Sequence, residues 1–136
     1  MTITKKLLQD FFEFLEDPSK FLYVDKDIVT AIGDYYGFTV DDLKENKVDS
    51  ILQDGLEDFI SYSFPELSKN KNLPFTMKIV DFRDLSSHTS FENGVDIWIV
   101  IEITDNKSKE KSNWQISGWT SSYEGNHWNF NDITKV

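Results

Sequence analysis

The chain has 136 residues, of which 39% are hydrophobic and 28% charged, and its formal net charge is −10. This length and composition predict a single globular domain over residues 1–136 and exclude a disordered chain. No apolar run approaches the roughly 20 residues that span a bilayer. Because Asp10 and Glu13 interrupt the stretch that a signal peptide keeps apolar, we expect a cytoplasmic protein, and the absence of cysteine fits a reducing compartment.

The negative charge is concentrated in the first half of the chain. Residues 1–68 hold 15 acidic and 6 basic side chains, a balance of −9, whereas residues 69–136 hold 9 acidic and 8 basic side chains, a balance of −1. Such a surface repels nucleic-acid phosphates, so we expect no direct nucleic-acid binding. It favours encounter with a basic protein partner, although a solubilising role explains the same charge.

Three segments at the start of the chain predict helices. Residues 4–16 place apolar side chains at three- and four-residue spacing, and Pro18 ends this helix because proline lacks a backbone donor and clashes with the preceding turn. A second helix begins after the N-cap Asp25 and ends at Gly37, which favours the left-handed conformation. A short third helix opens at Thr39 with a capping box.

The next apolar stripe predicts a helix over residues 49–63 that ends at Pro65. Gly55 inside this run weakens the helix by roughly 1 kcal/mol relative to alanine, so we expect another helix to pack closely there. The outer face of the predicted helix carries three carboxylates: Asp54, Glu57 and Asp58. Residues 1–67 therefore form the acidic, helical part of the predicted domain.

After a polar link, the period of the apolar pattern changes from 3.6 to 2, which is typical of strands. Strands are predicted over residues 75–79, 95–104 and 114–119, with a short fourth strand over residues 133–136. Since strands and helices do not alternate, residues 74–136 are expected to form an antiparallel sheet. The sequence thus predicts an α+β fold, with N-terminal helices packed on one face of a C-terminal antiparallel sheet of three to four strands.

One face of this sheet is expected to carry exposed aromatic side chains. If the helices cover the isoleucines of residues 95–104, the opposite face displays Trp98, Val100 and Trp119. Large aromatic side chains are rarely left in water without cause. A homodimer through the sheet face, a further helix, a ligand or the curl of the sheet could each cover them.

The chain lacks the common catalytic and metal-binding motifs. Its two histidines, His88 and His127, occur in neither an HxxxH nor an HxH spacing, so we predict no metal site. Its six glycines form no phosphate loop and no GxSxG elbow, and no calcium loop is present. We therefore expect no cofactor and no catalytic residue. His88 is expected to be exposed in a polar loop, and it would approach His127 only if both loops lie at one end of the sheet.

The densest polar and aromatic stretch covers residues 118–130. Here Glu124 could orient His127 as a general base, with Tyr123 and Trp128 beside them. A tight hairpin explains the same residues, because glycine and asparagine supply positive φ at the turn and aromatic side chains pair across the strands. We favour the hairpin, since catalytic sites usually draw on distant segments.

The last third of the chain resembles a pattern found in small phage and bacterial proteins. In that pattern, a strand of alternating tryptophan and apolar residues leads through a serine-rich turn into a short acidic-aromatic strand. The matching residues are Trp114, Gly118, Trp119, Ser121, Ser122, Tyr123, Gly125 and Trp128. The resemblance implies a phage or mobile-element setting, hence the host cell cytoplasm, rather than an activity.

The order of helices before a sheet is also similar to the cone-shaped nuclear-transport-factor-two-like fold. This resemblance implies a larger curved sheet around a pocket that often contains an Asp/His pair. The two loop histidines of this chain fit that pair poorly.

The first functional hypothesis is a non-enzymatic acidic binding protein of phage or bacterial origin, such as an inhibitor or immunity-type protein that docks on a protein partner. The alternative is a small-molecule-binding or enzymatic cone-like domain with an aromatic pocket. Mimicry of nucleic acid by helix carboxylates is a third hypothesis. The candidate binding residues are Trp98, Trp119, Tyr123, Glu124, His127, Trp128, Asp54, Glu57 and Asp58.

Overall fold

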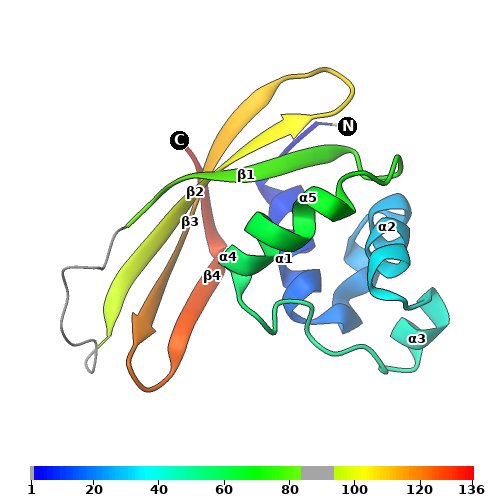
Figure 1. Cartoon of the computed structure of the whole chain (residues 1–136), viewed down its shortest axis with the longest axis horizontal. Coiled ribbons are helices and arrows are strands. Elements are labelled where there is room, and N and C mark those ends of the chain that lie inside the picture. Colours follow the sequence, from blue (N-terminus) through cyan, green and yellow to red (C-terminus); the bar gives the residue numbers. More distant parts are fainter. Residues whose placement is uncertain (1, 84–93) are drawn as a thin grey trace.

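A computed structural model describes residues 2–83 and 94–136, and it confirms the predicted α+β fold (Figure 1). The helical part contains α1 (Lys5–Glu16), the 3₁₀ helix η1 (Pro18–Tyr23), α2 (Lys26–Tyr36), α3 (Val40–Lys44), α4 (Leu56–Asp58), the π-helix η2 (Phe59–Ser63) and α5 (Phe64–Leu67). The sheet contains β1 (Phe75–Phe82), β2 (Val95–Asp105), β3 (Lys111–Ser121) and β4 (Gly125–Lys135). Its strand order is β1-β2-β3-β4, and every neighbouring pair is antiparallel.

The predicted ends of the first three helices are confirmed by their capping interactions. The hydroxyl of Thr4 accepts a hydrogen bond from the Leu7 amide (3.1 Å) at the start of α1. Asp25 caps α2, and Gly37 ends it in the left-handed conformation with a φ of +81°. At α3, Thr39 and Asp42 form the predicted capping box.

The helix predicted over residues 49–63 is wrong in its first half. Residues 51–54 form a turn, and helical structure begins at Leu56. Gly55 precedes that helix with a φ of +99°, a conformation that a helix interior does not permit. The expected close packing of another helix at Gly55 is also wrong, because a Cβ placed there would contact nothing within 4 Å.

Pro65 does not end the helical run, contrary to the prediction. In the π-helix η2, the amide of Phe64 donates to the carbonyl of Phe59, five residues earlier. A new α-helix, α5, begins after this π-helical turn, and Pro65 falls in its first turn. A first-turn residue has no intrahelical partner for its amide, so the missing N–H of proline costs little there. The run continues to Leu67.

The fourth strand is much longer than the predicted residues 133–136. It starts at Gly125 and pairs with β3 on both sides of an irregularity, since Ser117 lies opposite Asn129 and Ile116 lies opposite Ile133. Three residues of β4 are thus inserted between neighbouring pairs, which disrupts the two-residue alternation. This insertion hid most of β4 from the sequence pattern.

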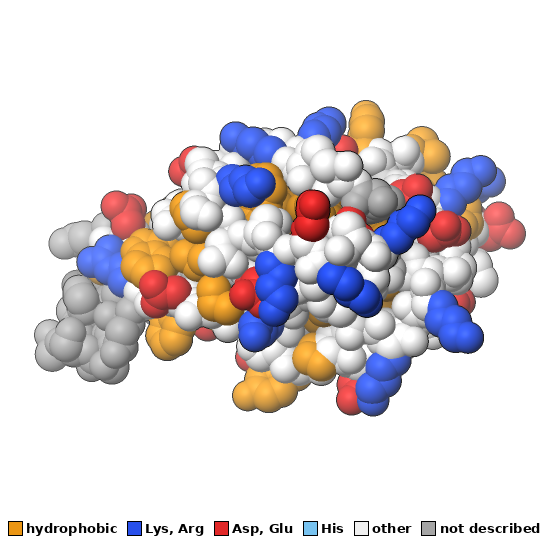
Figure 2. All heavy atoms as spheres, turned by 90° about the horizontal axis from the view of Figure 1, so that it is seen from above, with side chains coloured by type: hydrophobic (Ala, Val, Ile, Leu, Met, Phe, Trp, Pro, Cys, Tyr) orange, Lys and Arg blue, Asp and Glu red, His pale blue; other side chains and the backbone are white. Residues whose placement is uncertain are grey.

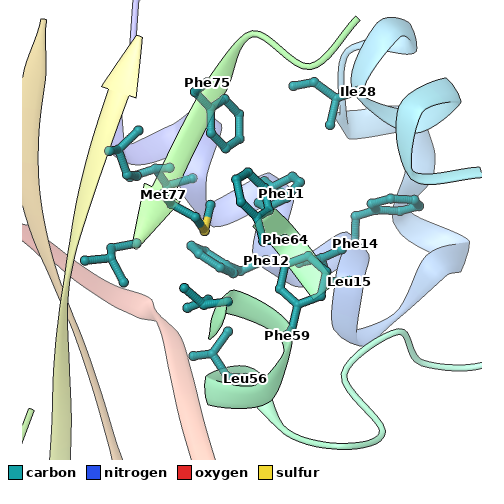
Figure 3. Packing of buried hydrophobic residues seen from close by; sticks show 14 of the residues in the cluster. Phe11, Phe12, Phe14, Leu15, Ile28, Leu56, Phe59, Phe64, Phe75 and Met77 are labelled. Carbon is teal, nitrogen blue, oxygen red and sulfur yellow. The ribbon is translucent and has the colours of Figure 1, made fainter. Parts of the chain in front are cut away.

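The helices and the sheet share one hydrophobic core. Ile99, Ile101 and Ile103 of β2 are at most 2% exposed, as expected for the face that the helices cover. Phenylalanine rings join the two parts of the chain: Phe12 stacks on Phe130 (5.4 Å between centroids) and Phe64 on Phe75 (6.0 Å). Figure 3 shows Phe12, Phe64 and Phe75 converging between β1 and the helices. The end of the sheet with the β3–β4 turn extends beyond them (Figure 1).

Candidate functional site

The predicted site residues fall on two surfaces. We call the exposed carboxylates of Asp49, Asp54, Glu57 and Asp58 the acidic segment. The second surface, the hairpin cluster, consists of the side chains at and beside the β3–β4 turn: Trp119, Tyr123, Glu124 and His127. Together with Trp98 and Trp128, these surfaces contain every candidate residue of the sequence.

The acidic segment is held in place by backbone contacts with α1. The amide of Ile51 donates to the carbonyl of Leu15 (2.8 Å), and the hydroxyl of Ser50 donates to the same carbonyl (3.4 Å). Ile51 and Leu52 are half-buried against the core, which turns the polar residues around them outward. The carboxylates therefore project from a turn and a short helix, and not from the regular helix that the pattern predicted.

The carboxylates of the acidic segment form no ion pair with the described residues. None of the ion pairs of residues 2–83 and 94–136 involves Asp49, Asp54, Glu57 or Asp58. The sequence itself explains this, because residues 48–68 contain five acidic side chains and no lysine, arginine or histidine. No close ion pair within the described residues offsets the repulsion among them.

A hollow of about 440 Å³ lies beside the acidic segment, lined in part by Tyr36, Asp42, Asp49 and Asp54. Burial raises the pKa of the Tyr36 hydroxyl, and the negative charge of Asp54 adds to this effect, while a hydrogen bond with Ser63 opposes it. The only positive side chain in its lining is Lys47, whose ammonium group pairs with Glu45 at 2.6 Å. The acidic segment thus borders a concave, negatively charged surface.

In the hairpin cluster, the imidazole of His127 stacks on the indole of Trp119. Their ring centroids are 4.4 Å apart and their planes differ by 11°. The two residues lie opposite each other in β3 and β4, so strand pairing produces the contact. Nε2 of His127 is 3.8 Å from Oε2 of Glu124, which is an ion pair when the imidazole is protonated. The hairpin turn lies between these strands at residues 122–124. Gly125 has the expected positive φ (+73°), but the prediction that asparagine also supplies one is wrong, because Asn126 belongs to β4.

Trp98 lies on the same face of the sheet as Trp119, and that face points away from the helices. Trp98 pairs with Ser117 and Asp96 pairs with Trp119, so the two tryptophans are diagonal neighbours. Trp119 is 39% exposed. On the same face of the sheet, Lys78 and Lys111 pair with Glu102 (3.7 and 3.6 Å), so this face is not uniformly acidic. Seen from above, the molecule likewise has acidic, basic and hydrophobic side chains mixed over the visible surface (Figure 2).

Trp128 lies on the other face of the sheet, opposite Gly118, and packs against the core. It lines a hollow of about 240 Å³ together with Glu16, Leu52 and Phe130. The alternative hypothesis expected Trp98, Trp119, Tyr123 and His127 to line one pocket. Of these four, His127 lines the hollow beside Trp128, whereas Trp98 and Trp119 occupy the outer face and Tyr123 is 78% exposed at the turn.

The acidic segment contacts β4 next to His127 of the hairpin cluster. Nδ2 of Asn126, in β4, donates to Oε1 of Glu57, in α4, at 3.4 Å. The candidate residues predicted from the sequence do not include Asn126, Asp49 or Glu16, because proximity across the fold leaves no local pattern. His88 lies outside the described residues, so its expected exposure and its approach to His127 are not addressed.

The residues that the structure describes contain no group of three histidine, aspartate or glutamate side chains placed to hold a metal ion. Among these residues, no helix has the length and apolar character needed to cross a membrane. Comparison of the chain with protein-family models, curated proteins and solved structures finds no match.

Proposed function

We propose that this chain is a non-enzymatic binding protein that docks its acidic segment on a basic surface of a protein partner, as an inhibitor or immunity-type protein of phage or bacterial origin does. The observation that carries the proposal is the set of four exposed carboxylates that form no ion pair with any described residue. A lysine- or arginine-rich partner would relieve their repulsion and be attracted from a distance.

The position of the acidic segment supports the same proposal. It borders the hollow next to Tyr36, and through the contact between Glu57 and Asn126 it adjoins the hairpin cluster. Interfaces commonly combine charged rims with aromatic anchors such as tryptophan and tyrosine. Tyr62 (74% exposed), one turn after Asp58, and Tyr123 at the β3–β4 turn are suitable anchors.

Affinity capture with charge-neutralised variants tests the proposal. The immobilised wild-type chain and the variant Asp54→Asn/Glu57→Gln/Asp58→Asn are incubated with the same bacterial lysate. We expect a basic protein to be retained by the wild type at low salt and released at about 0.5 M salt, because the screening length falls from about 10 Å at 0.1 M to about 3 Å at 1 M. The variant should retain at least tenfold less of it.

The matched control is Asp41→Asn/Glu110→Gln/Asp132→Asn, which removes the same charge from exposed residues outside the acidic segment. The control should retain the partner as the wild type does. The activity of the purified partner, measured with and without the chain, then distinguishes an inhibitor from a simple binder. Equal retention by the wild type and the acidic-segment variant at both salt concentrations would contradict the proposal.

A further inference from the structure

A second surface of the helical part has the opposite character to the acidic segment. A groove of about 410 Å³ lies between η1, α2 and α3, and its walls are mainly apolar. This volume is within the range of roughly 300–1,000 Å³ that is typical of binding pockets. The apolar walls consist of Phe21, Leu22, Val24, Val29 and Val40.

The sequence of η1 explains why apolar side chains remain at the surface here. Pro18 starts a 3₁₀ helix directly after α1, and Phe21, Leu22 and Tyr23 follow one another at its end. A 3₁₀ helix has three residues per turn, so three consecutive side chains point in three directions and only one can face the core. Phe21 packs against the core, whereas Leu22 is 80% exposed and Tyr23 is 72% exposed.

The charges in the groove are positive. Its lining contains two lysines, Lys26 and Lys44, and no aspartate or glutamate. Lys26 lies one turn before Val29 and Thr30 on α2, and Lys44 lies one turn after Val40 on α3, so each wall combines an apolar side chain with a lysine. Neither ammonium group forms an ion pair with a described residue. Two lysines without an acidic partner among the described residues are unusual here, because residues 1–68 carry a net charge of −9.

We propose that this groove binds an amphipathic helix of a partner protein that carries carboxylates beside its apolar face. Apolar side chains at three- and four-residue spacing would cover Leu22 and Val40, and the carboxylates would reach Lys26 and Lys44. A small ligand within the groove would leave most of the Leu22 side chain in water, whereas a helix lying along the groove covers it. The groove is distinct from the acidic segment. The acidic segment attracts a basic surface, whereas the groove selects an acidic helix.

Selection from a displayed library of random 16-residue peptides on the immobilised full chain tests this site. We expect the retained peptides to combine aspartate or glutamate with leucine, isoleucine or phenylalanine at helical spacing. Their affinity, measured by fluorescence anisotropy with labelled synthetic peptides, should fall at least tenfold for Lys26→Glu/Lys44→Glu and at least fivefold for Leu22→Ser. A peptide with lysine in place of each acidic residue should not bind the wild type.

The control Lys71→Glu/Lys107→Glu makes the same charge change at exposed lysines that form no ion pair with described residues, and it should bind within twofold of the wild type. Circular dichroism checks that all variants are folded, which is expected because the substituted side chains lie at the surface. Retained peptides that are basic, or that bind the groove variants as tightly as the wild type, overturn the proposal. Two further outcomes overturn the proposal. One is a wild-type dimer in sedimentation that Leu22→Ser dissociates, which would assign the groove to a second copy of the chain. The other is saturation of the groove by decanoate with no peptide retained.

Discussion

At the scale of single residues, the hairpin cluster depends on a glycine. Gly118 in β3 lies opposite Trp128 in β4, and a Cβ at this position would overlap the carbonyl oxygen of His127. The absence of a side chain lets β4 approach β3 closely. This close approach brings the neighbouring pair, Trp119 and His127, into the stacked contact at 4.4 Å.

Gly118→Ala is therefore expected to destabilise the fold by about 1–3 kcal/mol, because the backbone of β4 must move to admit the methyl group. Urea unfolding measures the change in the free energy of unfolding. Ser117→Ala, at the adjacent position of the same strand, is the control and should cost less than about 0.5 kcal/mol. If both substitutions had the same small effect, the close approach of the strands at Gly118 would not be a constraint on the fold.

At the scale of elements, α3, the shortest of the three elements that line the groove, depends on a capping box. The α3 helix has only five residues, and one carboxylate oxygen of Asp42 accepts hydrogen bonds from both the amide (2.8 Å) and the hydroxyl (3.1 Å) of Thr39. These hydrogen bonds lower the pKa of Asp42, with the bond from the Thr39 amide as the largest cause. The ionised form is therefore favoured in the folded protein.

A lowered folded-state pKa stabilises the fold at pH values above the unfolded-state pKa, and this stabilisation is lost as the pH falls through the folded-state pKa. We expect Asp42→Asn to lower the melting temperature at neutral pH, and the difference from the wild type to shrink as the pH falls below about 4. Asp41→Asn, in the same first turn but outside the capping box, should have a smaller effect. Thermal unfolding followed by circular dichroism from neutral to acidic pH tests this, and equal shifts for both variants would contradict it.

At the scale of the whole molecule, the helices and the sheet are joined by buried aromatic contacts. Phe12 of α1 is fully buried and stacks on Phe130 of β4, which connects the first helix to the last strand. Its contacts extend to Phe11, whose ring in turn meets Phe75 of β1. Such a shared core predicts that the helical and sheet parts unfold in one cooperative transition.

Two spectroscopic signals report on the two parts separately. All four tryptophans lie in strands, so tryptophan fluorescence follows the sheet, whereas far-ultraviolet circular dichroism is dominated by the helices. We expect coincident urea transitions for the wild type, and Phe12→Ala should shift both together by about 3–5 kcal/mol. Tyr62→Ala, at a side chain 74% exposed, is the control and should change stability little. Separate transitions for the two signals would show that the chain is not one cooperative domain.

Much of the fold follows from local patterns in the sequence. The spacing of apolar residues predicted α1 and α2, the alternation in β2 predicted a half-buried strand, and the capping residues predicted where the first three helices begin. These features rest on interactions within a few residues of each other, which sequence patterns record directly. The same patterns predicted the α+β class and the antiparallel sheet.

Other features depended on backbone irregularities that interrupt these patterns. Gly55 and the π-turn before Pro65 changed the second half of the helical region, and the insertion in β4 concealed most of that strand. The π-turn and the insertion each shift the hydrogen-bond register and so break the periodicity on which the pattern relies. Gly55 interrupts the predicted helix through its positive φ.

The sequence predicted that the excess of acidic side chains lies in residues 1–68, and that Asp54, Glu57 and Asp58 lie on the outside of a helix. Only the tertiary structure decided that the acidic segment meets the hairpin cluster through Glu57 and Asn126, and that Trp128 faces the core while Trp119 faces outward. It also created the groove, because Leu22, Lys26 and Lys44 come from three elements whose packing brings them together. Charge and periodicity are local properties of a chain, whereas a binding surface is assembled from side chains that become neighbours only when the core forms.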